Sequence, residues 1–344
     1  MEWDRRTFLA LLGSLPAGLW FRGARADGVE PRGRSQNVVR PRIAVVYGRS
    51  EAGKFDKGFN QLAFAGLEAA CAGADVVVRE FEPVGPGEEA SMIVQAATEA
   101  DLVVTVGWGL HVAAKEASRL SPSTRFSVID AVVEQPRFQS LVFRENEGAF
   151  LAGYLAAEIS STRTIGFVGA LSTPVIERFR AGYRGGAFHA DPTLTVRETY
   201  IGTTGEAYHD PFKGLLAAER LIEQGADILF AAAGRSGLGV YQAAADHGVF
   251  AIGVDANQNF LHPGTMLTSV VKRVDTAVQR AVGSLIAGTW REGVVSLGLK
   301  EEGMRLALDG YNHDLIGEAN WAKVEALRTQ LIAGAVKAPA SVGE

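Results

Sequence analysis

The chain has 344 residues with a formal net charge of -5, and 47% of its residues are hydrophobic. This acidic balance argues against a nucleic-acid groove, which needs clustered basic side chains, so we expect no nucleic-acid partner. The single cysteine, Cys71, excludes an internal disulfide framework, so the stability of the fold must come from packing.

The first residues predict export from the cytoplasm. The pair Arg5 and Arg6 has the twin-arginine pattern, an apolar run follows over residues 8–21, and residues 24–26 form a small-residue cleavage site. The alternative is a cytoplasmic amphipathic helix, but the order of these features favours a signal peptide over residues 1–26. We therefore expect a periplasmic protein exported by the twin-arginine pathway. Cys71 lies far from the cleavage site, so we expect no lipoprotein.

Residues 27–40 are rich in Gly, Pro and Arg and predict a disordered leader. Beyond it, apolar runs bounded by turn residues alternate with helix-period segments. Strands are predicted at residues 43–47, 76–81, 102–106, 126–130, 141–143, 165–168, 228–232, 251–255 and 266–271. Helices are predicted at residues 59–72, 89–100, 112–120, 148–159, 176–187, 215–224 and 238–247. This alternation is typical of an α/β protein with parallel sheets that are covered on both faces.

The elements fall into two series separated near residues 160–163, which suggests two doubly wound lobes. A later helix at residues 275–287 would belong to the first lobe if the chain crosses between the lobes more than once. The periodicity leaves that crossing open.

The signals for an enzyme are weak. The six histidines lack a metal-binding spacing, and the Gly234–Gly239 loop has neither the dinucleotide-binding nor the nucleophile-elbow spacing of glycines. Gly234 still allows a close backbone approach to a ligand, although a purely structural turn fits it nearly as well. We expect no catalytic residues, no metal and no cofactor. A hydrolase triad would be defined by geometry and could escape a sequence search.

Polar and aromatic side chains recur where predicted strands end. Asp130, Asp255 and Lys272 close three strands, and Trp108 follows a fourth. In a doubly wound sheet these carboxyl ends face the ligand. Each aspartate could instead cap a helix. The loop over residues 54–61, which follows the first strand, carries Phe59 and Asn60 and could stack on a ring and bind its edge, or could be a solvated turn.

Several segments resemble the basic membrane protein family, the substrate-binding components of ABC transporters that include bacterial purine-nucleoside receptors. The resemblance runs from about residue 42 to 331. It rests on the segments 59–61, 126–133, 143–153, 234–239, 252–255 and 268–273.

The resemblance implies a type I periplasmic-binding-protein fold, with two doubly wound parallel-sheet lobes joined by a three-stranded hinge. The lobes are expected at residues 41–145 with about 272–298, and at residues 146–268 with about 299–338. The resemblance also implies a nucleoside in the cleft, with its base between Phe59 and Tyr208. The implied polar contacts come from Asp130, Asp255, Lys272 and Asn60.

This chain departs from the family pattern at four places. An acid expected after the first strand is missing at Gly48, Tyr208 replaces the usual Phe, Arg235 replaces a Gly, and no cysteine stands at the cleavage site. The missing acid and the added arginine favour a change of ligand to a free base, a more acidic solute or another ring compound.

The sequence thus predicts a monomeric periplasmic binding protein that captures a purine-nucleoside-like solute and delivers it to an ABC-transporter permease. A ligand sensor for a chemoreceptor or kinase would use the same cleft. A sugar-responsive repressor would need a DNA-binding helix-turn-helix in place of the export signal.

Overall fold

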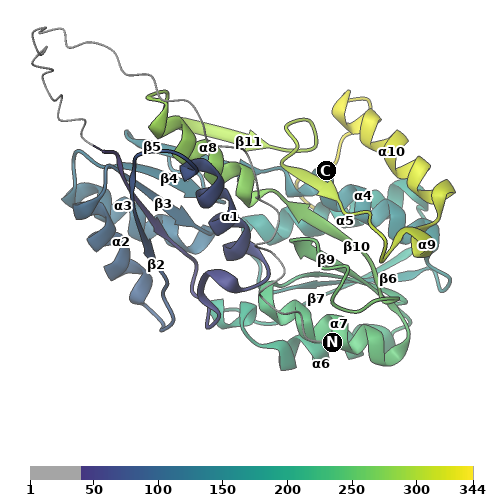
Figure 1. Cartoon of the computed structure of the whole chain (residues 1–344). Helices are drawn as coiled ribbons and strands as arrows, with labels where there is room; N and C mark the ends of the chain where they lie inside the picture. Colours follow the sequence, from purple (N-terminus) through teal and green to yellow (C-terminus); the bar gives the residue numbers. More distant parts are fainter. Residues whose placement is uncertain (1–39, 344) are drawn as a thin grey trace, which may run out of the picture. The chain divides into compact units, whose positions relative to one another are not determined.

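The computed structural model describes residues 40–343, which form two lobes, each built around a six-stranded sheet (Figure 1). The predicted signal peptide and residues 27–39 of the predicted leader lie outside the described residues. Both sheets belong to one unit, Arg40–Glu344. Among the described helices, none is long and apolar enough to span a bilayer.

The first sheet is entirely parallel, in the order β11-β5-β4-β3-β1-β2. Its strands are β1 (Arg42–Val46), β2 (Val77–Phe81), β3 (Leu102–Val106), β4 (Arg125–Ile129), β5 (Phe138–Phe143) and β11 (Gly293–Leu297). Helices α1 (Phe59–Cys71) and α8 (Val274–Ile286) cover one face, and α2 (Glu88–Glu99) and α3 (His111–Leu120) cover the other. Successive residues of β1 enter different core clusters, Ile43 and Val45 in one and Ala44 and Val46 in the other, which explains its unbroken apolar run.

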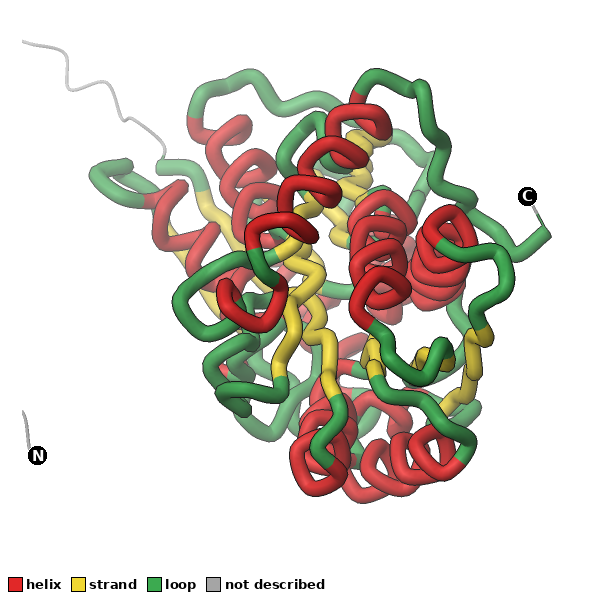
Figure 2. Tube along the Cα trace, turned by 90° about the vertical axis from the view of Figure 1, so that its right-hand side faces the viewer, coloured by secondary structure: helices red, strands yellow, loops and turns green. Residues whose placement is uncertain are grey.

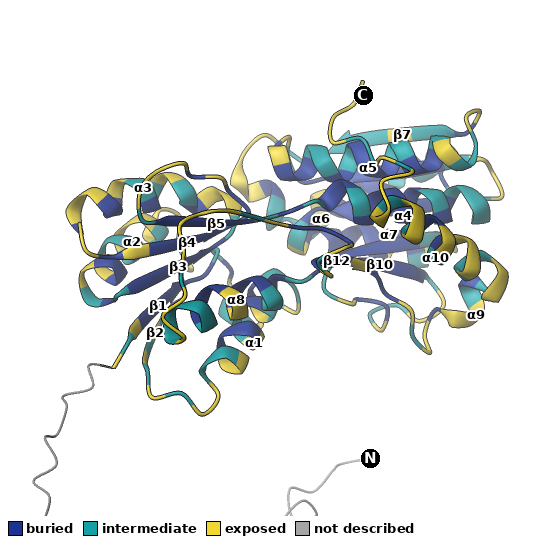
Figure 3. Cartoon of the chain, turned by 90° about the horizontal axis from the view of Figure 1, so that it is seen from above, coloured by how far each residue is buried: buried dark blue, intermediate teal, exposed yellow. Residues whose placement is uncertain are grey.

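The second sheet has the order β12-β10-β9-β8-β6-β7, with β12 antiparallel to β10 and the other pairs parallel. Its strands are β6 (Thr164–Gly169), β7 (Thr195–Tyr200), β8 (Ile228–Ala232), β9 (Phe250–Asp255), β10 (Met266–Lys272) and β12 (Met304–Leu306). Its helices are α4 (Glu145–Ile159), α5 (Pro174–Ala190), α6 (Pro211–Glu223), α7 (Gly237–His247), α9 (His313–Ile316) and α10 (Glu318–Ile332). Helices flank the strands in the side view, and the central strands are buried (Figures 2 and 3).

Three chain segments connect the lobes, after β5, after β10 and between β11 and β12. The predicted α/β architecture with two doubly wound lobes and a three-stranded hinge is therefore confirmed. Most predicted elements match within one or two residues. Strand β5 and helix α4 each begin three residues earlier than predicted, α6 begins four residues earlier, and α5 ends three residues later. Strands β7, β11 and β12 and helices α9 and α10 were not predicted.

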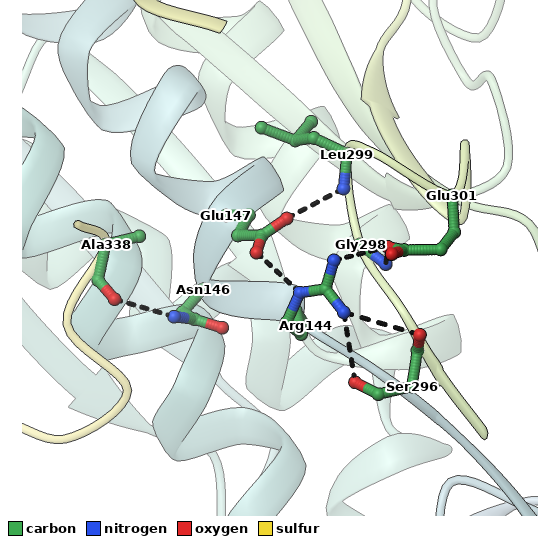
Figure 4. A network of polar contacts seen from close by, with 8 residues as sticks. All are labelled: Arg144, Asn146, Glu147, Ser296, Gly298, Leu299, Glu301 and Ala338. Carbon is green, nitrogen blue, oxygen red and sulfur yellow. Dashed lines mark hydrogen bonds and ion pairs between the residues drawn. The ribbon is translucent and has the colours of Figure 1, made fainter. Parts of the chain in front are cut away.

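The guanidinium group of Arg144 joins the segment after β5 to the segment between β11 and β12 (Figure 4). Arg144, between β5 and α4, pairs with Glu147 at 2.5 Å and with Glu301, and donates to the carbonyl oxygen of Ser296 at 3.3 Å. Glu147 in turn accepts a hydrogen bond from the backbone N–H of Leu299 at 2.7 Å. Two hinge segments that lie about 150 residues apart in sequence are thus held together by charge-assisted hydrogen bonds.

A buried glycine fixes how α8 returns to the first lobe. A Cβ atom at Gly66 of α1 would lie 2.2 Å from the carbonyl oxygen of Asp275 in α8. Since this neighbour is backbone, the two helices must separate to admit a side chain. Because α8 packs on α1, the helix predicted at residues 275–287 belongs to the first lobe, and the chain crosses between the lobes more than once.

We expect Gly66→Ala to lower the free energy of unfolding by about 1–3 kcal/mol, the cost of overpacking a fitted helix contact. Gly283→Ala, on α8 itself, is the matched control: nothing lies within 4 Å of the point that a Cβ atom would occupy there, so better helix propensity should stabilise the protein by about 0.5–1 kcal/mol. Denaturant melts of the two variants measure both values. A neutral Gly66→Ala variant would contradict the tight docking of α8.

Candidate ligand-binding site

The centre of the candidate site is a buried ammonium group at the end of β10. Lys272 is 1% exposed, and its Nζ lies 2.7 Å from both carboxylate oxygens of Asp130 and 2.9 Å from Oε1 of Glu145. Asp130 directly follows β4 in the first lobe, and Glu145 begins α4 beside the hinge. The cluster therefore joins the two lobes at the carboxyl ends of their strands, where parallel sheets bind ligands.

A second cation, Arg178, balances the negative charge of Glu145. Arg178 of α5 donates from Nε to Oε2 of the fully buried Glu145 at 2.6 Å. Burial opposes ionisation of Glu145, but the charges of Lys272 and Arg178 outweigh it and lower the pKa of Glu145. Burial likewise opposes protonation of Lys272, but Asp130, Glu145 and Asp255 outweigh it and raise the pKa of Lys272. Burial raises the pKa of Asp130, and the charge of Lys272 opposes that shift. Glu145 and Lys272 are therefore ionised at neutral pH.

Asp255, the last residue of β9, differs from the other two acids because it has no partner. Within residues 40–343 its carboxylate makes no hydrogen bond or ion pair. Burial raises its pKa to about 7, the charge of Lys272 opposes the shift, and the acids Asp130, Asp56 and Glu145 add to it. Asp130 and Asp255 both have positive φ, 75° and 64°, and neither caps a helix. An unpaired, partly buried carboxylate is a group that a ligand donor can satisfy.

Phe59 lies beside the same ammonium group, from the first lobe. It is the first residue of α1, and its ring centroid is 5.3 Å from Nζ of Lys272, within cation–π range. The rings of Phe143 and Phe179 lie at 4.9 and 5.8 Å from the same atom. Phe59 is only partly buried, which leaves ring surface available to a ligand.

The loop before Phe59 is braced by its own side chains. Asp56 accepts hydrogen bonds from the backbone N–H groups of Gly58, Asn60 and Gln61 and so caps α1. Asn60 is 4% exposed and donates from Nδ2 to the carbonyl oxygens of Gly48 at 2.8 Å and Gly53 at 3.2 Å. In this form the Asn60 amide positions the loop, and its role as a ligand contact stays a prediction.

Tyr208 faces the cluster from the second lobe. It ends the short 3-10 helix η3 (Gly205–Tyr208). Burial raises the pKa of its hydroxyl, Thr173 lowers it, and the charges of Asp130, Lys272 and Asp255 also act on it. Gly234 has a φ of +55°, and a Cβ atom there would meet the Tyr208 ring at 3.2 Å. Gly234 therefore allows Tyr208 to pack against the loop.

Trp108, the remaining predicted site residue, lies apart from this network in the described part of the chain. Its side chain is 37% exposed, and its ring lies 5.2 Å from the ring of His111. The structure thus brings Phe59, Asp130, Tyr208, Asp255 and Lys272 around one cluster.

Sequence reasoning missed Glu145 and Arg178. Glu145 stands two residues after the end of β5, so the rule that singled out Asp130 and Asp255 could have found it. Arg178 lies inside a helix, where nothing in the sequence marks it.

The geometry agrees with comparisons to known proteins. Residues 49–341 match a protein family described as Bmp, ABC transporter substrate-binding protein PnrA-like. The chain belongs to this Bmp family. It is 32% identical over 262 residues to basic membrane protein D of Borreliella burgdorferi, covering 74% of this chain and 76% of the relative. The resemblance to the basic membrane protein family is confirmed.

A solved structure of a solute-binding protein supports the fold. An ABC-transporter solute-binding protein from Aeropyrum pernix K1 superimposes with a TM-score of 0.77 at 26% identity, covering 87% of this chain and 94% of the other. The type I periplasmic-binding-protein fold is therefore confirmed. Bmp proteins are solute-binding components rather than enzymes, and they work outside the cytoplasmic membrane.

Some Bmp relatives are lipoproteins. A relative from Pyrococcus abyssi, named an uncharacterized lipoprotein, is 29% identical over 313 residues, covering 86% of this chain and 75% of the relative.

The structure shows which partners the arginines near the departures from the Bmp pattern have. Arg235 pairs with Glu51 at 2.6 Å, and Arg49 pairs with Glu206 at 2.6 Å. Each arginine therefore already has a carboxylate partner, which removes the reason to expect a more acidic solute on account of Arg235.

We expect Asp255→Asn to stabilise the ligand-free protein at pH 8. An acid whose folded pKa is about 7, against about 3.9 when unfolded, binds more protons in the folded state, so stability falls as pH rises through that window. The amide of Asn cannot ionise, so it removes the cost of a buried charge. We expect the free energy of unfolding to rise by about 1–2 kcal/mol, or Tm by a few degrees, after allowance for solvent screening. Calorimetric scans at pH 8 and pH 4 test it, since the gain should vanish at pH 4.

Proposed function

We propose that this protein is the substrate-binding component of an ABC transporter for a purine-nucleoside-like solute, which it captures between its lobes and delivers to a permease. The observation that carries the proposal is the unpaired Asp255 carboxylate, on which the charges of Lys272 and Asp130 act, in a site that Phe59 borders from one lobe and Tyr208 from the other.

The aromatic rings give the site its affinity for a flat ring. Phe59 and Tyr208 come from different lobes and both border the Lys272 cluster. A base held between them would gain about 1–3 kcal/mol from each stacked face. Because each lobe supplies one face, the ligand gains the second face only in the closed form. The base therefore favours hinge closure through its differential affinity for that form.

The polar groups give the site its orientation. An ionised Asp255 accepts hydrogen bonds from ring N–H or amino groups, which purine bases present at their edge. The Lys272–Asp130 pair offers a donor and an acceptor to neighbouring hydroxyl groups, as on a ribose. The contact to Asp255 satisfies a carboxylate that is costly to leave unpaired in a buried site.

The charges of the cluster favour an uncharged solute. Asp130, Glu145 and Asp255 outnumber Lys272 and Arg178 by one, so the site carries a small negative excess when Asp255 is ionised. A phosphorylated nucleoside would bring a like charge into this low-dielectric region, where repulsion is strong.

The proposal includes a cellular route. The twin-arginine pattern at Arg5 and Arg6 and the cleavage site without cysteine support export of the folded, non-lipidated protein to the periplasm. Fractionation of cells that carry Arg5→Lys with Arg6→Lys would place the precursor in the cytoplasm if this route is correct.

We expect Phe59→Ala to weaken purine-nucleoside binding at least about tenfold, through loss of one stacked face. Phe55→Ala is the matched control, because Phe55 lies in the same loop and is 59% exposed. A thermal-shift screen against nucleosides and free bases identifies the best binder, and calorimetry measures its Kd in each variant. Equal losses in both variants, or none in either, would contradict the stacking role of Phe59.

Binding should also depend on the charge of Asp255. If the ligand donates to the carboxylate, only the ionised form binds, and a pKa of about 7 makes Kd rise about tenfold from pH 8 to pH 6. In Asp255→Asn the affinity should be weaker at pH 8 and flat across this range. Calorimetric titrations at three pH values measure both. A pH dependence that survives in Asp255→Asn would assign it to another group.

A further inference from the structure

Two ion pairs join the lobes away from the hinge. Arg49 and Glu51 follow β1 in the first lobe, and their partners, Glu206 in η3 and Arg235 in the 3-10 helix η4 (Gly234–Ser236), belong to the second. Both pairs have an N–O distance of 2.6 Å. Each lobe supplies one arginine and one glutamate, so the pairing is reciprocal. We refer to Arg49–Glu206 and Arg235–Glu51 as the mouth pairs.

The mouth pairs are more exposed to solvent than the Lys272 cluster. The glutamate side chains are 63% and 77% exposed and the arginine side chains 16% and 45%, whereas the Lys272, Asp130 and Glu145 side chains are 1%, 6% and 0% exposed. Arg49 also lies 4.0 Å from Glu89 of its own lobe. All four charges also act on one side chain: burial lowers the pKa of His209, Arg49 and Arg235 lower it further, and Glu206 and Glu51 oppose them. The two pairs are therefore neighbours.

The loops that carry the mouth pairs are braced within each lobe. In the second lobe, Ser236 donates to the carbonyl oxygen of Ala207 at 2.7 Å and accepts from the backbone N–H of Asp210 at 2.8 Å, which ties η4 to η3. In the first lobe, Asn60 holds the carbonyl oxygens of Gly48 and Gly53 on either side of the two charged residues. The charges are thus presented by ordered backbone.

We propose that the mouth pairs form a salt-sensitive latch that sets the balance between the closed and open forms of the protein. Opening the hinge separates both pairs at once, so both stabilise the closed form. Exposed ion pairs are individually weak and are screened by salt, so the latch biases closure without locking it. The latch acts in the ligand-free protein and does not depend on which solute binds.

The test measures lobe separation directly. Spin labels at Val84→Cys and Phe212→Cys, two exposed positions on opposite lobes, report opening in a Cys71→Ala background. In low salt we expect the ligand-free protein to show a short-distance population. Arg49→Glu with Arg235→Glu should reduce the ratio of closed to open molecules about three- to tenfold, and so should 1 M NaCl in the parent. Adding Glu206→Arg and Glu51→Arg should restore the ratio.

The control is Arg119→Glu, which breaks an exposed ion pair with Glu116 inside the first lobe and should leave the distances unchanged. Circular dichroism checks that each variant is folded. Identical distance distributions in the parent and the double reversal would overturn the latch, and so would a fourfold swap that fails to restore closure. Because no ligand is present, either result leaves the proposed nucleoside site untouched.

Discussion

The buried ammonium group of Lys272 is the constraint on which the rest of the site depends. An unpaired charge in the interior costs several kcal/mol, so the fold must supply acids at hydrogen-bonding distance. It does so with Asp130 from the first lobe and Glu145 from the hinge, and Arg178 then balances Glu145. Since Lys272 ends β10, where the chain crosses between the lobes, this requirement places the cluster where the two lobes meet. Phe59, Tyr208 and Asp255 are arranged around it.

Asp255 shows the cost of keeping such a site ready for a ligand. The cluster could be neutral overall without it, and its carboxylate has no partner in the described chain. It is also held at a positive φ of 64°, a conformation that costs a non-glycine residue of order 1–3 kcal/mol. A residue that is strained, partly buried and unpaired destabilises the ligand-free protein, and it persists where binding requires it. The excess charge is therefore better explained by a ligand than by folding.

The sequence predicted most of the fold because the central strands are buried on both faces and read as apolar runs. It missed β7 and β11, whose residues are largely part-exposed or exposed, and β12, which has three residues. Their pairing comes from tertiary contacts that periodicity does not record. At the site, Asp130, Asp255 and Lys272 were found because strand ends face the cleft. The pairing of Arg178 with Glu145 escaped detection because it joins two helices across 33 residues.

Arg235 illustrates how position decides the meaning of a substitution. In the sequence, an arginine in the ligand loop suggested a different cargo. In the structure its guanidinium group pairs with Glu51 of the other lobe, so it acts on closure rather than on the chemistry of the ligand. The mouth pairs and the Lys272 cluster then differ in dielectric environment. The Lys272 cluster is shielded from water and salt, and its attraction is strong and fixed. The mouth pairs are more exposed and are screened. Hinge motion needs both kinds of contact. The buried cluster keeps the lobes joined, while the weak mouth pairs let them open and close at an energy near that of thermal motion.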